Sequence, residues 1–78
     1  MILEIISPEK VLFSGEIHLV KVPGSDGDFE IMNRHAAIIS SLNKGKIKVI
    51  TKEGEQLFFE TEGGFVESQK NKVSILVE

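Results

Sequence analysis

The hydrophobic residues of the chain fall into short runs, which are separated by turn residues every 6 to 12 positions. The runs are rich in β-branched and aromatic residues, which favour strands. They cover positions 2–6, 11–13, 17–22, 29–32, 36–42, 46–51, 56–61, 65–68 and 73–77. Short strands at regular spacing with turn chemistry between them are typical of β-sandwiches and β-barrels. We therefore predict an all-β fold without helices.

The segments between the runs contain residues that favour turns. They are Ser7-Pro8, Ser14-Gly15, Pro23-Gly24 with Gly27, Asn33-Arg34, positions 43–45, Glu53-Gly54, Gly63-Gly64 and positions 69–71. Proline sets φ at the entry of a turn, and glycine adopts the positive φ that many turns need. Each of these segments is therefore predicted to separate two strands.

Two predicted strands alternate between apolar and other side chains, which gives each of them one buried face. Ile47 and Val49 alternate with lysines, and the apolar residues at 73, 75 and 77 share a face. Other strands are apolar on both faces, at positions 38–39, 57–59 and 75–76. In a lone sandwich each strand has one dry and one wet face. Two interpretations stay open: scattered surface apolar residues, or a protein interface.

Length and composition limit the possible functions. With 78 residues and no break in composition, the chain forms one small domain, residues 1–78. It has no cysteine, which excludes a disulfide or a thiolate zinc site. The net charge of −3 argues against a general nucleic-acid binder. The alternation of Lys44, Lys46 and Lys48 predicts a solvated strand face, and a surface for acidic partners stays open as the alternative.

Residues 22–31 read V-P-G-S-D-G-D-F-E-I and place Asp26, Asp28 and Glu30 in and after a glycine turn. An EF-hand loop that began at Asp26 would need glycine sixth and glutamate twelfth, where this chain has isoleucine and alanine. The glycines match neither a P-loop nor a dinucleotide fingerprint. The two histidines, His18 and His35, accompany no thiol and no serine elbow. We therefore expect no catalytic residue, no metal site and no cofactor.

The same segment matches the pattern of a known family. The pattern is V-P-G-x-x-G, then isoleucine, then H-A, and it falls here on Val22-Pro23-Gly24, Gly27, Ile31 and His35-Ala36. Further matches are Pro8-Glu9, Phe13-Ser14-Gly15, Gly63-Gly64-Phe65 and positions 73–76. Over its whole length the chain resembles the N-terminal domain of the epsilon subunit of F-type ATP synthase, which is called delta in mitochondria. It departs from the pattern at Glu30, where the family has a third glycine, at Asn33-Arg34, where it commonly has Pro-Gly, and at Ala37, where it has proline. The family usually continues into a C-terminal hairpin of two helices, which we expect to be absent here.

The resemblance implies a sandwich of two five-stranded sheets, about ten short strands in all, in a subunit that is not an enzyme. It implies a central-stalk rotor subunit, which clamps the gamma subunit to the c-ring of a proton- or sodium-translocating synthase and helps couple ion flow to ATP synthesis. The implied partners exclude nucleic acid and an obligate homo-oligomer. The implied location is peripheral, on the cytoplasmic face of the energy-transducing membrane, most simply the bacterial inner membrane.

Site residues follow from the resemblance by position in the family pattern. It assigns Asp26, Asp28 and Glu30 to the c-ring, and it assigns Ser7, His35, Ile38 and Ser40 to the gamma subunit.

Two alternative functions stay open from the residues alone. A lipoyl or biotinyl carrier domain presents a lysine at a hairpin tip, and the nearest tips are Lys44 in N-K-G and Lys52 in T-K-E, without the usual neighbours. A small oligonucleotide-binding barrel would use the lysines at 44–48, which lack interleaved aromatic residues for base stacking.

Overall fold

The computed structural model describes the whole chain, Met1–Glu78, and contains eight β-strands and no helix. The strands are β1 (Ile2–Ile6), β2 (Val11–Gly24), β3 (Gly27–Met32), β4 (Ile38–Leu42), β5 (Gly45–Thr51), β6 (Gln56–Thr61), β7 (Gly64–Gln69) and β8 (Lys72–Val77). The predicted all-β class is therefore confirmed. No helix with the length and apolar character of a membrane span occurs.

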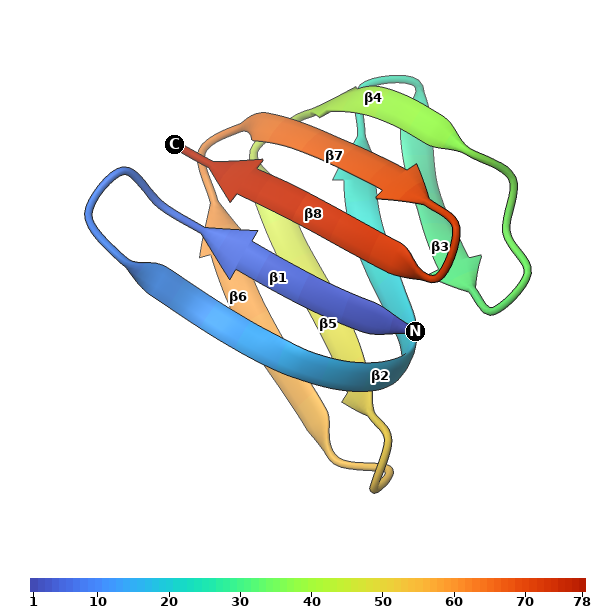
Figure 1. The fold of residues 1–78 in the computed structure, drawn as a ribbon. Coiled ribbons are helices and arrows are strands. Elements are labelled where there is room, and N and C mark those ends of the chain that lie inside the picture. Colours follow the sequence, from blue (N-terminus) through green and yellow to red (C-terminus); the bar gives the residue numbers. More distant parts are fainter.

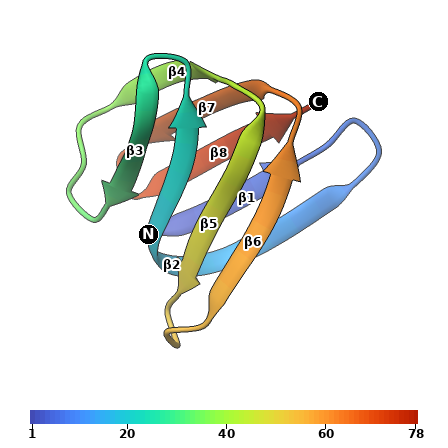
Figure 2. The same cartoon turned by 180° about the vertical axis from the view of Figure 1, so that it is seen from behind.

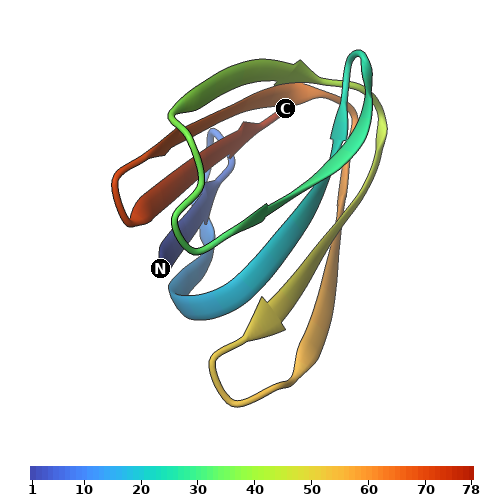
Figure 3. The same cartoon turned by 90° about the vertical axis from the view of Figure 1, so that its right-hand side faces the viewer.

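Backbone hydrogen bonds join the strands into one sheet that folds over to form two layers. The order is β1-β8-β7-β4-β2-β5-β6, with β3 on β2 and a further pairing of β1 with β2. One layer contains β4, β7, β8, β1 and the first part of β2, and the other contains β3, the rest of β2, β5 and β6 (Figure 1, Figure 2). Figure 3 shows the two layers facing each other from the side. This is the predicted sandwich.

Strand β2 is 14 residues long and belongs to both layers. Its first part pairs with β1, and from Ile17 onward it pairs with β5, with a register shift between Ile17 and Leu19. The prediction of a turn at Ser14-Gly15 is therefore wrong: both residues are paired with β1, and the strand bends instead of ending. Because the predicted runs 11–13 and 17–22 form one strand, the nine predicted runs become eight strands, fewer than the ten or so that the resemblance implies. They are arranged as layers of five and four segments, not as two five-stranded sheets.

The core lies between the layers and consists of the inward-facing side chains at alternate strand positions. Its 14 buried apolar residues are Met1, Leu3, Ile5, Ile17, Val20, Val22, Ile31, Leu42, Ile47, Val49, Val66, Val73, Ile75 and Val77. Burying one such aliphatic side chain fully, relative to leaving it exposed to water, stabilises the folded state by roughly 1.5–3 kcal/mol. The alternation predicted for positions 47 and 49 and for 73, 75 and 77 is confirmed.

Glycines shape the turn between β2 and β3 that carries the acidic residues. Gly27 has φ +125°, which side chains rarely adopt. At Gly24 the backbone approaches closely, since an added Cβ would lie 2.7 Å from the carbonyl oxygen of Gly27 and against the ring of Phe29. The turn is therefore tight, and it holds Asp26 and Asp28 at an exposed end of the sandwich.

Candidate functional site

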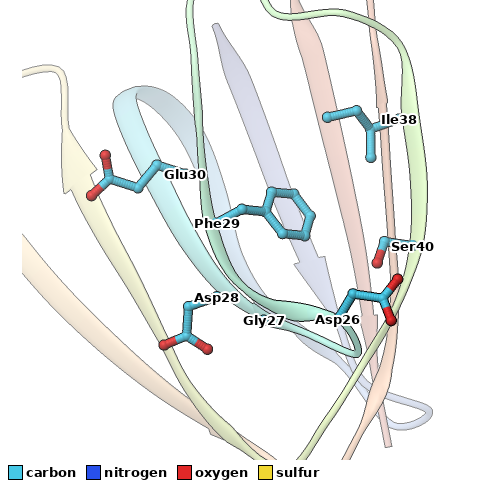
Figure 4. Close-up of a pocket in the computed structure, with 7 residues that line it drawn as sticks. All are labelled: Asp26, Gly27, Asp28, Phe29, Glu30, Ile38 and Ser40. Atoms are coloured by element: carbon cyan, nitrogen blue, oxygen red, sulfur yellow. The ribbon is translucent and has the colours of Figure 1, made fainter.

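The two layers are open along the edge where β3 faces β4. Strand β3 pairs only with β2, whereas β4 pairs with β7 and, through one residue pair, with β2. A hollow of about 550 Å³ lies between them, lined by Asp26, Gly27, Asp28, Phe29, Glu30, Ile38 and Ser40 (Figure 4). We call this hollow the seam. It brings the three acidic residues assigned to the c-ring together with two of the four residues assigned to gamma.

The side chains of the seam point in different directions. Asp28 and Glu30 extend from one side of β3, and Phe29 extends from the other side toward Ile38 (Figure 4). Asp26 lies at the turn, near Ser40 (Figure 4). The three carboxylates are exposed. None of them lies within 4.0 Å of a basic group, and the single ion pair of the chain joins Lys44 to Glu62. We call Asp26 in the turn, together with Asp28 and Glu30 of β3, the acidic turn; it presents negative charge without an ion pair to solvent.

No three or more metal-binding side chains converge anywhere in the structure. The alternation along β3 places Asp28 and Glu30 on one face. Asp26 lies in the turn before that strand, so the three acids do not surround a common point. The three carboxylates can instead attract a basic surface of a partner by their negative charge.

Ser7 and His35, which the resemblance assigns to gamma, lie in loops at opposite ends of the five-segment layer (Figure 1). The Ser7 hydroxyl donates to the carbonyl oxygen of Lys10 at 3.2 Å and accepts from the amides of Glu9 and Lys10. It stabilises the turn between β1 and β2. The structure therefore does not bring Ser7 and His35 into one site, and Ser7 has a structural task within its own turn.

His35 connects two loops. Its Nδ1 lies 2.8 Å from the carbonyl oxygen of Met32, and its Nε2 lies 2.8 Å from the carbonyl oxygen of Gln69, on the turn between β7 and β8. A neutral ring donates to one of these carbonyls and a protonated ring to both. Both ring nitrogens are thus engaged within the chain.

A row of apolar side chains crosses the outer face of the five-segment layer. Register places Phe65 of β7 beside Leu76 of β8, Leu76 beside Ile6 of β1, and Ile6 beside Val11 of β2. We call these four residues the apolar row. Phe65, Leu76 and Val11 are 57%, 53% and 54% exposed. Four neighbouring strands therefore each place an apolar side chain at the same level of this face, of which three are exposed and Ile6 is partly buried.

The apolar row continues toward β4. Ile39, which is 75% exposed, shares a hollow of about 220 Å³ with Phe65 and Leu76. The runs at 38–39 and 75–76, which are apolar on both faces of their strands, indicated part of this surface. Phe65 and Val11 were not identified as exposed from the sequence. The available signal was the pair of consecutive apolar residues, Phe65 with Val66, because neighbouring residues of a strand point to opposite faces and only one of the two can be buried in the core.

Comparison with known proteins identifies relatives over the full length. A family model described as ATP synthase, Delta/Epsilon chain, β-sandwich domain matches residues 1–78. The ATP synthase epsilon chain of Chlorobium limicola is 41% identical over 76 residues, which make up 97% of this chain and 86% of that one. The epsilon chain of Leptospira interrogans serovar copenhageni is 43% identical over 75 residues, 95% of this chain and 58% of that one. The chain thus spans little more than half the length of some relatives.

Solved structures share the fold. A chain in the mitochondrial ATP synthase of Euglena gracilis, solved as OSCP/F1/c-ring, matches with a TM-score of 0.92 at 18% identity, over 99% of this chain and 49% of that chain. A chain in the central stalk and c-ring of the Tetrahymena thermophila mitochondrial enzyme matches with a TM-score of 0.81 at 21% identity, over 99% and 62%. At these identities the likeness shows the sandwich fold alone.

Proposed function

Because the chain belongs to the family of ATP synthase delta/epsilon chain β-sandwich domains, we propose that it acts as a non-catalytic rotor subunit of an F-type ATP synthase. In this proposal it clamps the gamma subunit to the ring of c subunits and so helps couple proton or sodium flow to ATP synthesis. It is peripheral to the cytoplasmic face of the membrane and attached through these two partners.

The observation that carries the proposal is the apolar row. Contiguous exposed apolar patches on small domains usually mark protein interfaces. The core of the sandwich is complete without these side chains, since its buried residues all lie between the layers. A partner such as gamma, packed on the outer face of the five-segment layer, would remove Phe65 and Leu76 from water.

The seam and the acidic turn support a second contact in the proposal. The carboxylates of Asp26, Asp28 and Glu30 have no basic partner within 4.0 Å and would attract polar, basic loops of the c-ring. Ile38 and Ser40 line the opposite side of the seam. In the proposal they contact gamma, so that gamma and the c-ring meet along the seam. Ser7 and His35 would border the gamma surface through their loops.

Stiffness is the physical demand on such a clamp, because torque that bends a soft connector is not transmitted. The chain has 46 backbone hydrogen bonds among 78 residues, and strand β2 continues through both layers. Bending one layer relative to the other would therefore break strand pairing. This continuity supports a mechanical role.

A reconstitution experiment tests the proposed function. The tagged chain is mixed with purified gamma subunit and purified c-ring, and co-elution is followed by size-exclusion chromatography. We expect a ternary complex at micromolar concentration. A chain that elutes alone in the presence of both partners contradicts the proposal.

The Asp28→Lys variant tests the role of the acidic turn in this experiment. We expect it to weaken attachment to the c-ring and to change the free energy of unfolding by less than about 0.5 kcal/mol, as exposed surface changes usually do. Glu53→Lys, which makes the same charge change in the turn between β5 and β6, is the matched control and should bind normally. A large loss of stability in Asp28→Lys would show that this residue is structural.

A further inference from the structure

A second surface lies on the opposite layer, next to the acidic residues Asp28 and Glu30. Four lysines, Lys21 of β2, Lys44 just before β5, and Lys46 and Lys48 of β5, line one shallow hollow of about 360 Å³. We call them the lysine stripe. It runs along the two central strands, β2 and β5, of the layer seen in front in Figure 2.

The stripe places like charges side by side. Lys21 and Lys48 are direct partners in the register of β2 with β5. Like charges directly opposite each other in a sheet are destabilising. Only Lys44 of the stripe has an acidic partner within 4.0 Å, namely Glu62 at 3.9 Å, and both of those side chains are highly exposed. Lys21, Lys46 and Lys48 therefore form a concentration of positive charge without an ion pair within 4.0 Å, although Asp28 lines the same hollow.

Acidic residues border the stripe on both sides. On the β3 side, Glu30 pairs with Lys21, and on the β6 side, Glu60 pairs with Lys46. Neighbouring strands lie about 4.8 Å apart, so the positive zone is only about two strands wide. A flat anionic membrane or a nucleic-acid duplex would bring negative charge over the bordering carboxylates as well. The arrangement favours a narrow anionic partner that lies along the strands.

One exposed aromatic residue adjoins the stripe. Phe58 is 57% exposed and is the direct partner of Lys48 in the register of β5 with β6. A single aromatic ring offers a contact for one apolar side chain but no ladder on which successive bases stack. Along β5, Lys46 and Lys48 are two residues apart, about 7 Å, which equals the spacing of alternate side chains in an extended peptide.

We propose that the lysine stripe is a docking surface for an extended acidic segment of a partner protein. Carboxylates at alternate positions of the segment lie over Lys46 and Lys48 of β5, Lys21 adds its charge beside Lys48, and an apolar side chain of the segment covers Phe58. Because the apolar row lies on the other layer, this contact leaves the proposed gamma surface free. Asp28 and Glu30, which the proposed function assigns to the c-ring, lie at the border of the stripe.

The probe for this proposal is a fluorescein-labelled peptide of about ten residues, with glutamate at every second position and one leucine between them. Binding to the intact chain is measured by fluorescence anisotropy. We expect the affinity to fall by about tenfold in the Lys21→Gln, Lys48→Gln double variant, because two charge contacts are lost. The matched control is Lys70→Gln, Lys72→Gln, which removes the same net charge from the turn between β7 and β8 and should bind normally.

Three further probes identify the class of ligand. The same peptide with glutamine in place of glutamate should not bind, and single-stranded DNA of equal length and vesicles containing phosphatidylserine should bind more weakly than the acidic peptide. Tighter binding of DNA or vesicles overturns the proposal, as does equal weakening by the two double variants or the absence of peptide binding. The gamma and c-ring subunits are not in the assay, so these outcomes leave the rotor function to its own test.

Discussion

His35 holds together two loops that lie at one end of the five-segment layer. Its ring nitrogens face carbonyl oxygens of Met32 and Gln69, which are far apart in the sequence and adjacent in the fold. The loop before β4 also contains Arg34, whose φ of +64° is unusual for a residue with a side chain. The histidine therefore fixes the start of β4 and, through it, one wall of the seam.

Replacing His35 with alanine tests this positioning role. We expect His35→Ala to lower the free energy of unfolding by about 1–2 kcal/mol, because at least one side-chain hydrogen bond is lost and a carbonyl is left to solvent. The measurement is urea unfolding followed by circular dichroism. Unchanged stability combined with lost gamma binding would contradict this account and would show that the ring contacts the partner directly.

At the scale of elements, alternation in the sequence was enough to predict most strands and their buried faces. Ile47 and Val49 are buried as predicted, because one face of β5 packs on the opposite layer. The bend of β2 was not predictable in this way. Gly15 resembles a turn residue locally, but pairing with Leu3 in β1 keeps the chain extended there, and that pairing depends on tertiary structure.

Two glycines with positive φ differ in what surrounds them. Gly64, at the start of β7, has φ +145°, and an added Cβ would overlap the backbone carbonyl of Leu76. Gly27 has φ +125°, but no atom lies within 4 Å of an added Cβ. Gly64 is therefore restricted by both backbone conformation and space, and Gly27 by conformation alone.

This difference predicts a ranking of two alanine variants. Gly64→Ala should lower the free energy of unfolding by about 3 kcal/mol or more, because strain and steric overlap add. Gly27→Ala should cost about 1–2 kcal/mol from strain alone. The measurement is thermal unfolding of both variants, in which Gly64→Ala should show the larger loss of stability. Equal losses would show that the close approach of β7 and β8 at Gly64 is not a constraint.

The facing lysines of β2 and β5 make a prediction about stability. Lys48→Glu replaces a like-charge pair with an opposite-charge pair beside Lys21, so the free energy of unfolding should rise by about 0.5 kcal/mol. Chemical unfolding at low and high salt is the measurement, and the gain should shrink at high salt because exposed charges are screened. A loss of stability would mean that the two side chains do not meet.

At the scale of the whole molecule, the two outer faces of the sandwich have different chemistry. The five-segment layer carries the apolar row, and the other layer carries the lysine stripe between bordering acids. The acidic turn lies at one end, where β2 meets β3 (Figure 1). The acidic residues adjoin the lysine stripe, whereas the apolar row lies on the opposite face, so the proposed function gives each face a different kind of partner.

The seam could not be predicted from the sequence alone. Asp26 to Glu30 and Ile38 to Ser40 are close in sequence, but they face each other only because β4 pairs with β7 in the opposite layer. The two-faced apolar runs did indicate an exposed apolar surface. Its extent across β7, β8, β1 and β2 depends on strand order, which local patterns do not determine.

The central claim is that the outer face of the five-segment layer binds gamma, and two phenylalanines test it most directly. Phe65 and Phe58 are both 57% exposed, and they lie on opposite outer faces. Affinity for purified gamma is measured by calorimetry for Phe65→Ser and Phe58→Ser. The account predicts that Phe65→Ser weakens binding by about 2 kcal/mol, as loss of a buried aromatic contact does, and that Phe58→Ser binds normally. Normal binding by Phe65→Ser, or equal loss in both variants, would contradict it.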